Sequence, residues 1–363
     1  MSIASELSTL AANKAAIKAA IVAKSPATSP GDNMADWPAA IASIPSGGGS
    51  GSGEPTFPND GKTRFVIELR DRAYHDFRLA FKQSVANGVT IDWGDGTTPE
   101  SDSTTSQATR THIYNPSSYP AEYTITLTVN GGTLSLDGAL FGWNSITATQ
   151  PVSAYGSMLK YVSFGNIKSL GNYVFCYCIA LQSISLPSGV TSIGTSAFYN
   201  CQSLHSISFP SGLTSIGGSA FSSCHSLHSI SLPSGVTSIG GTAFYNCHSL
   251  QSISLPSGVT SIGINTLNNC QSLQSISFPS GLTSIAAGAF NSAVSCKIFD
   301  FSGCTAVPTL SNTNAFSITP DTKYIVVPDS LYDTWKAANN WNSSTNNIVS
   351  SIIKKSAFDA LTL

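Results

Sequence analysis

Histidine and glutamine recur at two fixed places in this chain, and both side chains can donate and accept hydrogen bonds. From Leu181 to Ser295 the sequence repeats in units of 23 residues, such as "LHSISFPSGLTSIGGSAFSSCHS" from Leu204. The second residue of each unit is Gln182, His205, His228, Gln251 or Gln274, and the twenty-second is Gln202, His225, His248 or Gln271. Stacked repeats would present these groups as two rows.

A second variable stripe, also expected to point outward, runs through Tyr199, Ser222, Tyr245 and Asn268. Amide and imidazole groups with tyrosines nearby suit hydrogen bonding and stacking against sugars or peptide backbones. We therefore take the two His/Gln rows, with Tyr199 and Tyr245, as the candidate ligand-binding residues. The alternative is a solvated polar face that keeps the array soluble without charge.

Other reactive side chains favour structural roles. His225, His228 and His248 could bind a metal, but no carboxylate or orienting partner is evident beside them in the sequence, so we expect no metal site. Asp92 and Asp95 flank a glycine turn, where two carboxylates with few other oxygen ligands favour a structural turn over a calcium site.

Four of the eight cysteines recur at the repeat spacing: Cys201, Cys224, Cys247 and Cys270. Neighbouring coils could bring them within disulfide range, but buried thiols are favoured over disulfides or a zinc site.

No nucleophile, metalloprotease or nucleotide-binding motif is present. The repeat region has almost no acidic residues, which argues against hydrolysis by a pair of carboxylates. We expect a protein that is not an enzyme and has no cofactor.

The repeat must bury its apolar residues by stacking, because one coil cannot bury its own. In the third unit Leu227, Ile230 and Leu232 are expected to face inward, followed by a "PSG" turn in which glycine supplies a positive φ. Val236 and Ile239 would form a second inward pair, Ala243 and Phe244 would fill the far side, and Cys247 would close the coil.

This pattern, together with a degenerate unit from Leu159, resembles the BspA-like leucine-rich repeats, in which L-x-x-I-x-I-P-x-x-V-T-x-I-G-x-x-A-F-x-x-C recurs. The resemblance covers about residues 159–295 and implies a solenoid, expected over residues 151–307. The segment "KYIVVPDSLYDTWKAANNW" resembles the cap that ends such arrays, and Leu331, Tyr332 and Trp335 would cover the last coil. This C-terminal cap is expected over residues 308–363.

The N-terminal segment predicts a helix that assembles chains. Apolar residues recur there at coiled-coil spacing, with one lysine on the seam: Ile3, Leu7, Leu10, Lys14, Ile17 and Ile21. We expect a helical assembly and attachment segment over residues 1–44, in a homotrimer; the alternative is an amphipathic helix packed on its own chain. A Gly/Ser/Pro-rich linker follows over residues 45–60.

Residues 61–150 change to a period of two, with strand-like runs "RFVIELR", "FRLAF", "VTIDW" and "EYTITLTV". The turn at Trp93 to Gly96, the pair His112 and Tyr114, and the final run Tyr123 to Val129 resemble the PKD-type β-sandwich. The resemblance implies a spacer or binding module. The predicted fold class is therefore multi-domain: a helical segment, a PKD-like β-sandwich, and a leucine-rich-repeat solenoid with a C-terminal helical cap.

Composition excludes several functions. Only 10% of residues are charged and the formal net charge is −2, which argues against nucleic-acid binding through a basic face. No run approaches the roughly 20 apolar residues of a membrane span, and the N-terminus does not resemble a secretory signal, so we expect no membrane insertion.

The order of segments resembles that of bacteriophage tail fibre and receptor-binding proteins. The leading hypothesis is a virion tail protein, made in the host cytoplasm, whose array binds a host-surface glycan or protein while its N-terminus contacts other virion proteins. The alternatives are a cellular surface adhesin and a purely structural spacer.

Overall fold

The computed structural model describes residues 57–58, 60–69, 76–86, 88–106, 108–136, 138, 159–165, 167–316, 324–341 and 351–361. The predicted assembly helix of residues 1–44 and nearly all of the predicted linker lie outside these residues. So does the predicted boundary between residues 150 and 151. Within the described residues, no helix has the length and apolar character needed to cross a lipid bilayer.

The N-terminal part of the described chain consists of antiparallel strands that form two sheets. The four predicted runs form strands, with β4, β5 and β7 in addition. The strands are β1 (Thr63–Leu69), β2 (Asp76–Gln83), β3 (Val89–Asp92), β4 (Glu100–Asp102), β5 (Ala108–Ile113), β6 (Ala121–Val129) and β7 (Leu134–Leu136). Alternate side chains such as Ile125 and Leu127 are fully buried between the sheets, as the period of two requires.

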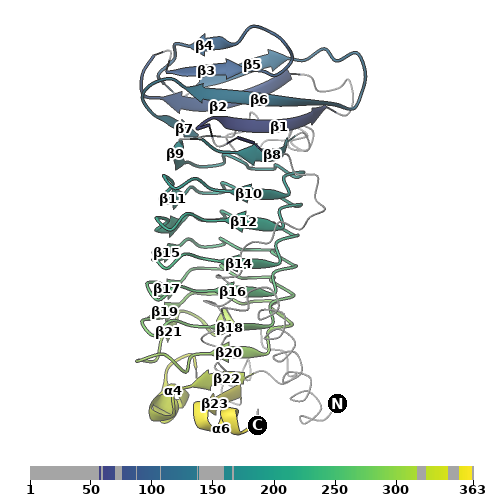
Figure 1. The fold of residues 1–363 in the computed structure, drawn as a ribbon. Helices are drawn as coiled ribbons and strands as arrows, with labels where there is room; N and C mark the ends of the chain where they lie inside the picture. Colours follow the sequence, from purple (N-terminus) through teal and green to yellow (C-terminus); the bar gives the residue numbers. More distant parts are fainter. Residues whose placement is uncertain are drawn as a thin grey trace.

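The rest of the chain is a leucine-rich-repeat β-solenoid of about seven turns. Each of these coils contributes one strand to each of two sides of the stack, and two further strands near the C-terminus extend the first side alone (Figure 1). The first side contains β8 (Leu159–Ser163), β10 (Ser183–Ser185), β12 (Ser206–Ser208), β14 (Ser229–Ser231), β16 (Ser252–Ser254), β18 (Ser275–Ser277), β20 (Ile298–Asp300), β22 (Tyr324–Val327) and β23 (Ile352–Lys354). The second contains β9 (Ile167–Leu170), β11 (Ser192–Ile193), β13 (Ser215–Ile216), β15 (Ser238–Ile239), β17 (Ser261–Ile262), β19 (Ser284–Ile285) and β21 (Thr309–Leu310).

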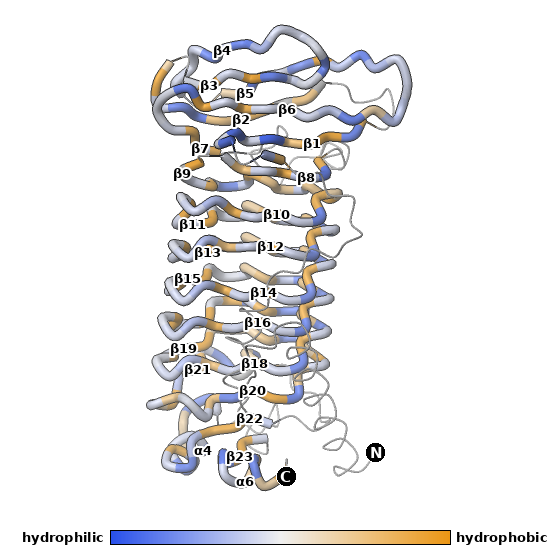
Figure 2. The backbone as a smooth tube through the Cα atoms, in the orientation of Figure 1, coloured by the Kyte–Doolittle hydropathy of each residue, from blue (hydrophilic) through white to orange (hydrophobic). Residues whose placement is uncertain are grey.

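Parallel pairing places each residue beside its copy in the next unit. Ile184 pairs with Ile207 on the first side, and Ile193 pairs with Ile216 on the second. Side chains alternate along a strand, so the isoleucines point inward and the flanking serines outward. The hydrophobic residues of successive coils consequently line up above one another (Figure 2).

The third side of the coil has no strands but has its own ladder of backbone hydrogen bonds. The Phe198 amide donates to the Ala220 carbonyl and the Phe221 amide to the Ala243 carbonyl, both at 2.8 Å. The rings of Phe198, Phe221 and Phe244 stack beneath this ladder, with centroids 5.1 and 5.6 Å apart and nearly parallel planes. In the next coil Leu267 replaces phenylalanine and interrupts the stack.

The eight cysteines are buried free thiols, as the sequence favoured. Four occupy the repeat position, and each donates to a phenylalanine carbonyl of the preceding coil; Cys224 and Cys247, for example, lie 3.2 and 3.1 Å from the carbonyl oxygens of Phe198 and Phe221. Burial raises the pKa of the Cys247 thiol to about 12, so it remains protonated and can act as this donor.

The expected positive φ at the "PSG" glycines is wrong. These turns close through a bond such as that from the Val190 amide to the Pro187 carbonyl, and their glycines are absent from the described residues with positive φ. The positive φ values lie on the third side, for example at Thr242 (57°) and Asn246 (60°). In the first four units close packing of the coils requires glycine directly after isoleucine, because a Cβ on Gly217 would lie 2.6 Å from the backbone of Gly194.

The antiparallel sheets continue directly into the solenoid. On one side β7 pairs in parallel with β9, so that one sheet has the order β15-β13-β11-β9-β7-β2-β5. On the other, β1 pairs with β8, Phe65 opposite Val162. One hydrophobic core runs from Phe65 through the coils to Trp341. The antiparallel sheets therefore close the first coil and protect its apolar face from water.

The other end of the array is closed by aromatic residues and short helices, which lie within the range 308–363 that the sequence predicts as a cap. Helix α4 (Tyr332–Ala337) contributes the buried Trp335, whose ring lies 5.3 Å from both Phe301 and Trp341. The Trp341 indole nitrogen donates to the Pro308 carbonyl at 2.7 Å. Two 3₁₀ turns and a final helix complete this end: η2 (Thr313–Ala315), η3 (Asp329–Leu331) and α6 (Lys355–Leu361). Leu331 and Tyr332 are half-buried against the core, as expected.

Candidate functional site

The solenoid contains an uninterrupted stretch without formal charge. Between Lys168 and Lys297 the sequence has no Asp, Glu, Lys or Arg. The polar groups there are hydroxyls, amides, thiols and four histidines. Any ligand of this surface must therefore be recognised through hydrogen bonds and stacking, and not through complementary charge.

The two predicted His/Gln rows lie on the bend that joins the third side of one coil to the first strand of the next. We call these nine residues the polar corner. Its first row precedes the strands and consists of Gln182, His205, His228, Gln251 and Gln274, all exposed. Its second row follows the cysteines and consists of Gln202, His225, His248 and Gln271, of which the two glutamines are exposed and the two histidines half-buried.

Backbone hydrogen bonds fix the spacing of the first row. The amide of His205 donates to the Gln182 carbonyl at 2.9 Å, and the amide of Gln251 donates to the His228 carbonyl at 2.8 Å. Neighbouring side chains of the row are therefore about 4.8 Å apart, the separation of adjacent strands. Exposed groups at this interval can contact an extended ligand that lies along the stack.

The second row is held by a side-chain network. The rings of His225 and His248 are stacked, with centroids 4.8 Å apart and planes 2° from parallel. The Asn269 amide nitrogen donates to Asn246 Oδ1 at 2.8 Å and lies 3.0 Å from His248 Nε2. Because an amide nitrogen only donates, His248 Nε2 is the acceptor in this contact. Gln271 completes the network by donating to Asn269 Oδ1 at 2.8 Å.

Asn246 and Asn269, together with Asn200, which accepts from Gln202 at 3.1 Å, are residues of this site that the sequence analysis missed. They occupy the twentieth position of the repeat, directly before cysteine, where φ is positive: 60° at Asn246 and 62° at Asn269. Asparagine tolerates this conformation better than most residues. An asparagine recurring beside a row of histidines was the available signal.

The second predicted stripe is only partly accessible. Tyr199 and Tyr245 are half-buried, as is Asn268. Ser222, which was expected to point outward, is only 3% exposed, so that expectation is wrong. Its side chain is too short to extend past the tyrosines at the same position of the neighbouring coils. The stripe thus offers two separated tyrosines beside the polar corner.

The turn at Asp92 and Asp95 uses its carboxylates within the protein. Asp92 Oδ1 accepts from the Gly94 amide at 2.9 Å, and Asp95 Oδ2 pairs with His112 Nε2 at 2.8 Å. The His112 ring stacks on Trp93 with centroids 4.8 Å apart. These contacts fit the predicted structural turn. Within the described residues no three His, Cys, Asp or Glu side chains gather in a way that could hold a metal ion.

The comparisons with known proteins concern the solenoid. The family model described as the BspA type leucine-rich repeat region matches residues 154–252 and 237–362, and so covers more than half of the chain. A comparison with curated proteins gives no significant match.

Several solved structures are similar. A leucine-rich repeat protein from Bacteroides ovatus is 28% identical, with a TM-score of 0.37 over 46% of this chain and 48% of that protein, so this chain spans about half of its length. The T. pallidum leucine-rich repeat protein is 29% identical, with a TM-score of 0.32 over 36% of this chain and 72% of that protein. A leucine-rich cell-surface protein from Faecalibacterium prausnitzii is 20% identical, with a TM-score of 0.22 over 54% and 66%.

The stacked histidines predict that acid destabilises the array. Burial, and to a smaller extent the neighbouring His248, lower the pKa of His225 from its ordinary value of 6.5. The unfolded chain therefore binds this proton more readily, so the contribution of His225 to stability is complete above about pH 6.5 and is lost as the pH falls below it.

We expect the urea midpoint of unfolding to fall when the pH is lowered from 7.5 to 5.0, and to fall further for the wild type than for His225→Gln. This variant carries glutamine, the residue that the first unit has at the same position, Gln202. His205→Gln, at an exposed first-row position, is the matched control and should keep the wild-type dependence. Equal pH dependence in wild type and His225→Gln would contradict the role assigned to the stack.

Proposed function

The chain belongs to the BspA-type leucine-rich repeat family, and on this premise we propose that it is a non-enzymatic protein that recognises an uncharged surface ligand through the polar corner. The observation that carries the proposal is the coincidence of two features. The coils between Lys168 and Lys297 have no formal charge, and their side chains with the most hydrogen-bonding groups lie in rows along one edge.

A neutral glycan or an extended peptide backbone fits this edge. Both present donors and acceptors at repeating intervals, and both can lie along a row whose members are about 4.8 Å apart. Amides and imidazoles can serve as donor or acceptor, which suits sugar hydroxyls and backbone groups alike. Individual contacts of this kind are weak, so affinity would come from several coils acting together.

We further infer that the protein acts as a bacteriophage tail fibre or receptor-binding protein, carried on the virion, with a host-surface glycan or protein as its ligand. Support comes from the predicted N-terminal helix, the linker after it and the distal array. The N-terminus would contact other virion proteins and hold the chains together as a homotrimer. A cellular surface adhesin of the same family is the second candidate, and it would use the same corner.

Recognition without charge predicts binding that is insensitive to salt. On a printed panel of neutral and charged glycans, we expect binding to neutral glycans to change by less than about twofold between 0.05 and 0.5 M NaCl, because screening acts only on charges. Replacing His205, His228, Gln251 and Gln274 with serine should abolish this binding. The matched control replaces three exposed threonines of the second side, Thr214, Thr237 and Thr260, with serine and should leave it intact.

Unchanged binding after the corner replacements would contradict the proposal and favour the spacer hypothesis. A preference for charged glycans that disappears in salt would also contradict it.

The fibre assignment predicts an assembly that depends on the N-terminus. Light scattering should give the mass of three chains for the full-length protein, because a short helix with apolar residues at coiled-coil spacing is stable only when it packs against other helices. Replacing Leu7 and Leu10 with aspartate should give single chains, whereas Ser8→Asp, beside the seam, should remain trimeric. A full-length protein that is monomeric at micromolar concentration would remove the main support for the fibre and place the adhesin ahead.

A further inference from the structure

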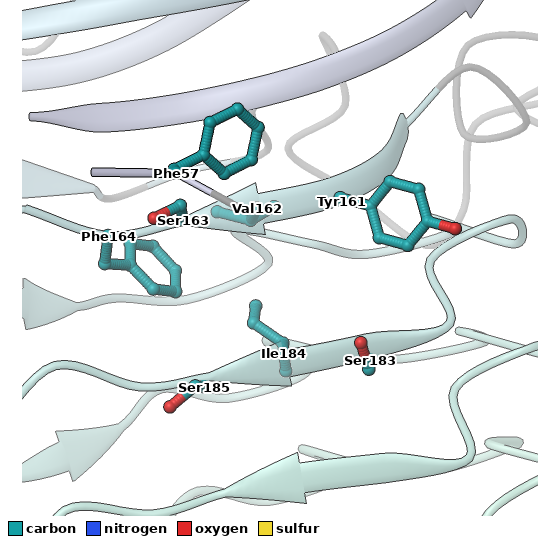
Figure 3. A pocket seen from close by; sticks show the side chains of 8 residues that line it. All are labelled: Phe57, Tyr161, Val162, Ser163, Phe164, Ser183, Ile184 and Ser185. Carbon is teal, nitrogen blue, oxygen red and sulfur yellow. The ribbon is translucent and has the colours of Figure 1, made fainter. Parts of the chain in front are cut away.

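A cavity of about 290 Å³ opens at the junction between the antiparallel sheets and the first complete coil (Figure 3). It lies between strands β8 and β10. Its lining includes three aromatic side chains, Phe57, Tyr161 and Phe164, and three serines, Ser163, Ser183 and Ser185. It is separate from the polar corner and contains none of its residues.

The cavity lies where the solenoid meets the antiparallel sheets. Strand β8 pairs with β1, and β10 pairs with β12; within the described residues no pairing joins β8 to β10, and the same holds for β12 and β14 and for β16 and β18. What sets this place apart is the sequence. The outward position before the central residue of the strand is serine in β10, β12, β14, β16 and β18, but it is Tyr161 in β8.

The lining has the chemistry of a sugar subsite. Aromatic faces pack against the C–H groups of a pyranose ring, and serine hydroxyls both donate to and accept from its hydroxyls. No charged side chain lines the cavity. The nearby Lys160 is held by Glu68 and Glu122 at 3.0 and 3.1 Å, and Arg64 is paired with Asp60. A ligand would therefore meet no unbalanced charge.

The size of the cavity limits the ligand. A volume of about 290 Å³ is at the lower end of the range for small-molecule pockets. That volume suits one ring with its substituents and not an oligomer. We propose that this junction cavity binds a single neutral pyranose, either free or as the terminal residue of a glycan.

The test is saturation-transfer NMR on the full-length protein with methyl glycosides of glucose, galactose, mannose and N-acetylglucosamine, and with glucuronic acid as a charged probe. At least one neutral glycoside should show transfer, with little from glucuronic acid. The affinity is expected to be about millimolar, because one ring of some dozen heavy atoms makes few contacts. Absence of transfer from every neutral glycoside, or a stronger signal from glucuronic acid, would overturn the proposal.

Variants locate the site. Ser185→Trp should fill the cavity and abolish transfer, whereas Ser231→Trp, at the same outward position two coils further on, should retain it. Both serines are exposed, so neither change should prevent folding. Tyr161→Ala should weaken binding by about five- to tenfold through loss of the aromatic face. Transfer that survives Ser185→Trp, or that is lost only in Ser231→Trp, would overturn the assignment to this cavity.

The outcome is independent of the proposed function. Replacing the polar corner leaves the cavity unchanged, and filling the cavity leaves the corner unchanged. Failure of one site therefore does not imply failure of the other.

Discussion

Backbone hydrogen bonds between coils, which place each residue beside its copy 23 residues later, are the constraint on which the rest of this structure depends. They make columns of identical side chains. The stacked phenylalanines, the buried thiols that donate to the preceding coil and the rows of the polar corner all follow from that one register. The ends of the columns are closed by the antiparallel sheets on one side and by Trp335 and Trp341 on the other.

The same register explains why the array has no charge. A charged residue repeated in every unit would stack on its own copy at about 4.8 Å, and each such contact costs about 1 kcal/mol even in water. Hydroxyls, amides and neutral imidazoles can stack at that distance without this penalty. Lysine occurs at the first-row position only at the two ends, as Lys160 and Lys297, where no copy lies beside it. The neutrality that suits the corner to uncharged ligands is thus a consequence of repetition.

Much of the fold could be predicted from the sequence, because each sequence repeat forms one coil of the solenoid. The repeat length, the inward leucines and isoleucines, the buried cysteines, the strands from Thr63 to Val129 and the C-terminal cap are all local patterns. The sequence could not show that β7 and β8 join the antiparallel sheets to the coils, since that pairing is between distant residues. The sequence analysis also placed positive φ at the "PSG" glycines, whereas the hydrogen bonding of the third side places it at residues such as Thr242 and Asn246. Of the site, the exposed first row could be predicted. The burial of Ser222 and the Asn269–His248 bond could not, because both depend on neighbouring coils. The junction cavity could not be predicted either, because it depends on a break in the repeat pattern.

The most direct test of the register is a pair of deletions. Removing Ala220–Thr242 takes out one whole unit of 23 residues and joins Ser219 to Ala243, which restores the native sequence at the junction. Removing Ala220–Ala243 takes out one residue more and shifts Phe244 out of its column. We expect urea unfolding of the first variant to remain a single sharp transition, and that of the second to broaden and move to lower urea as the coils beyond the junction lose their pairing. Equal unfolding curves for the two variants would contradict the account.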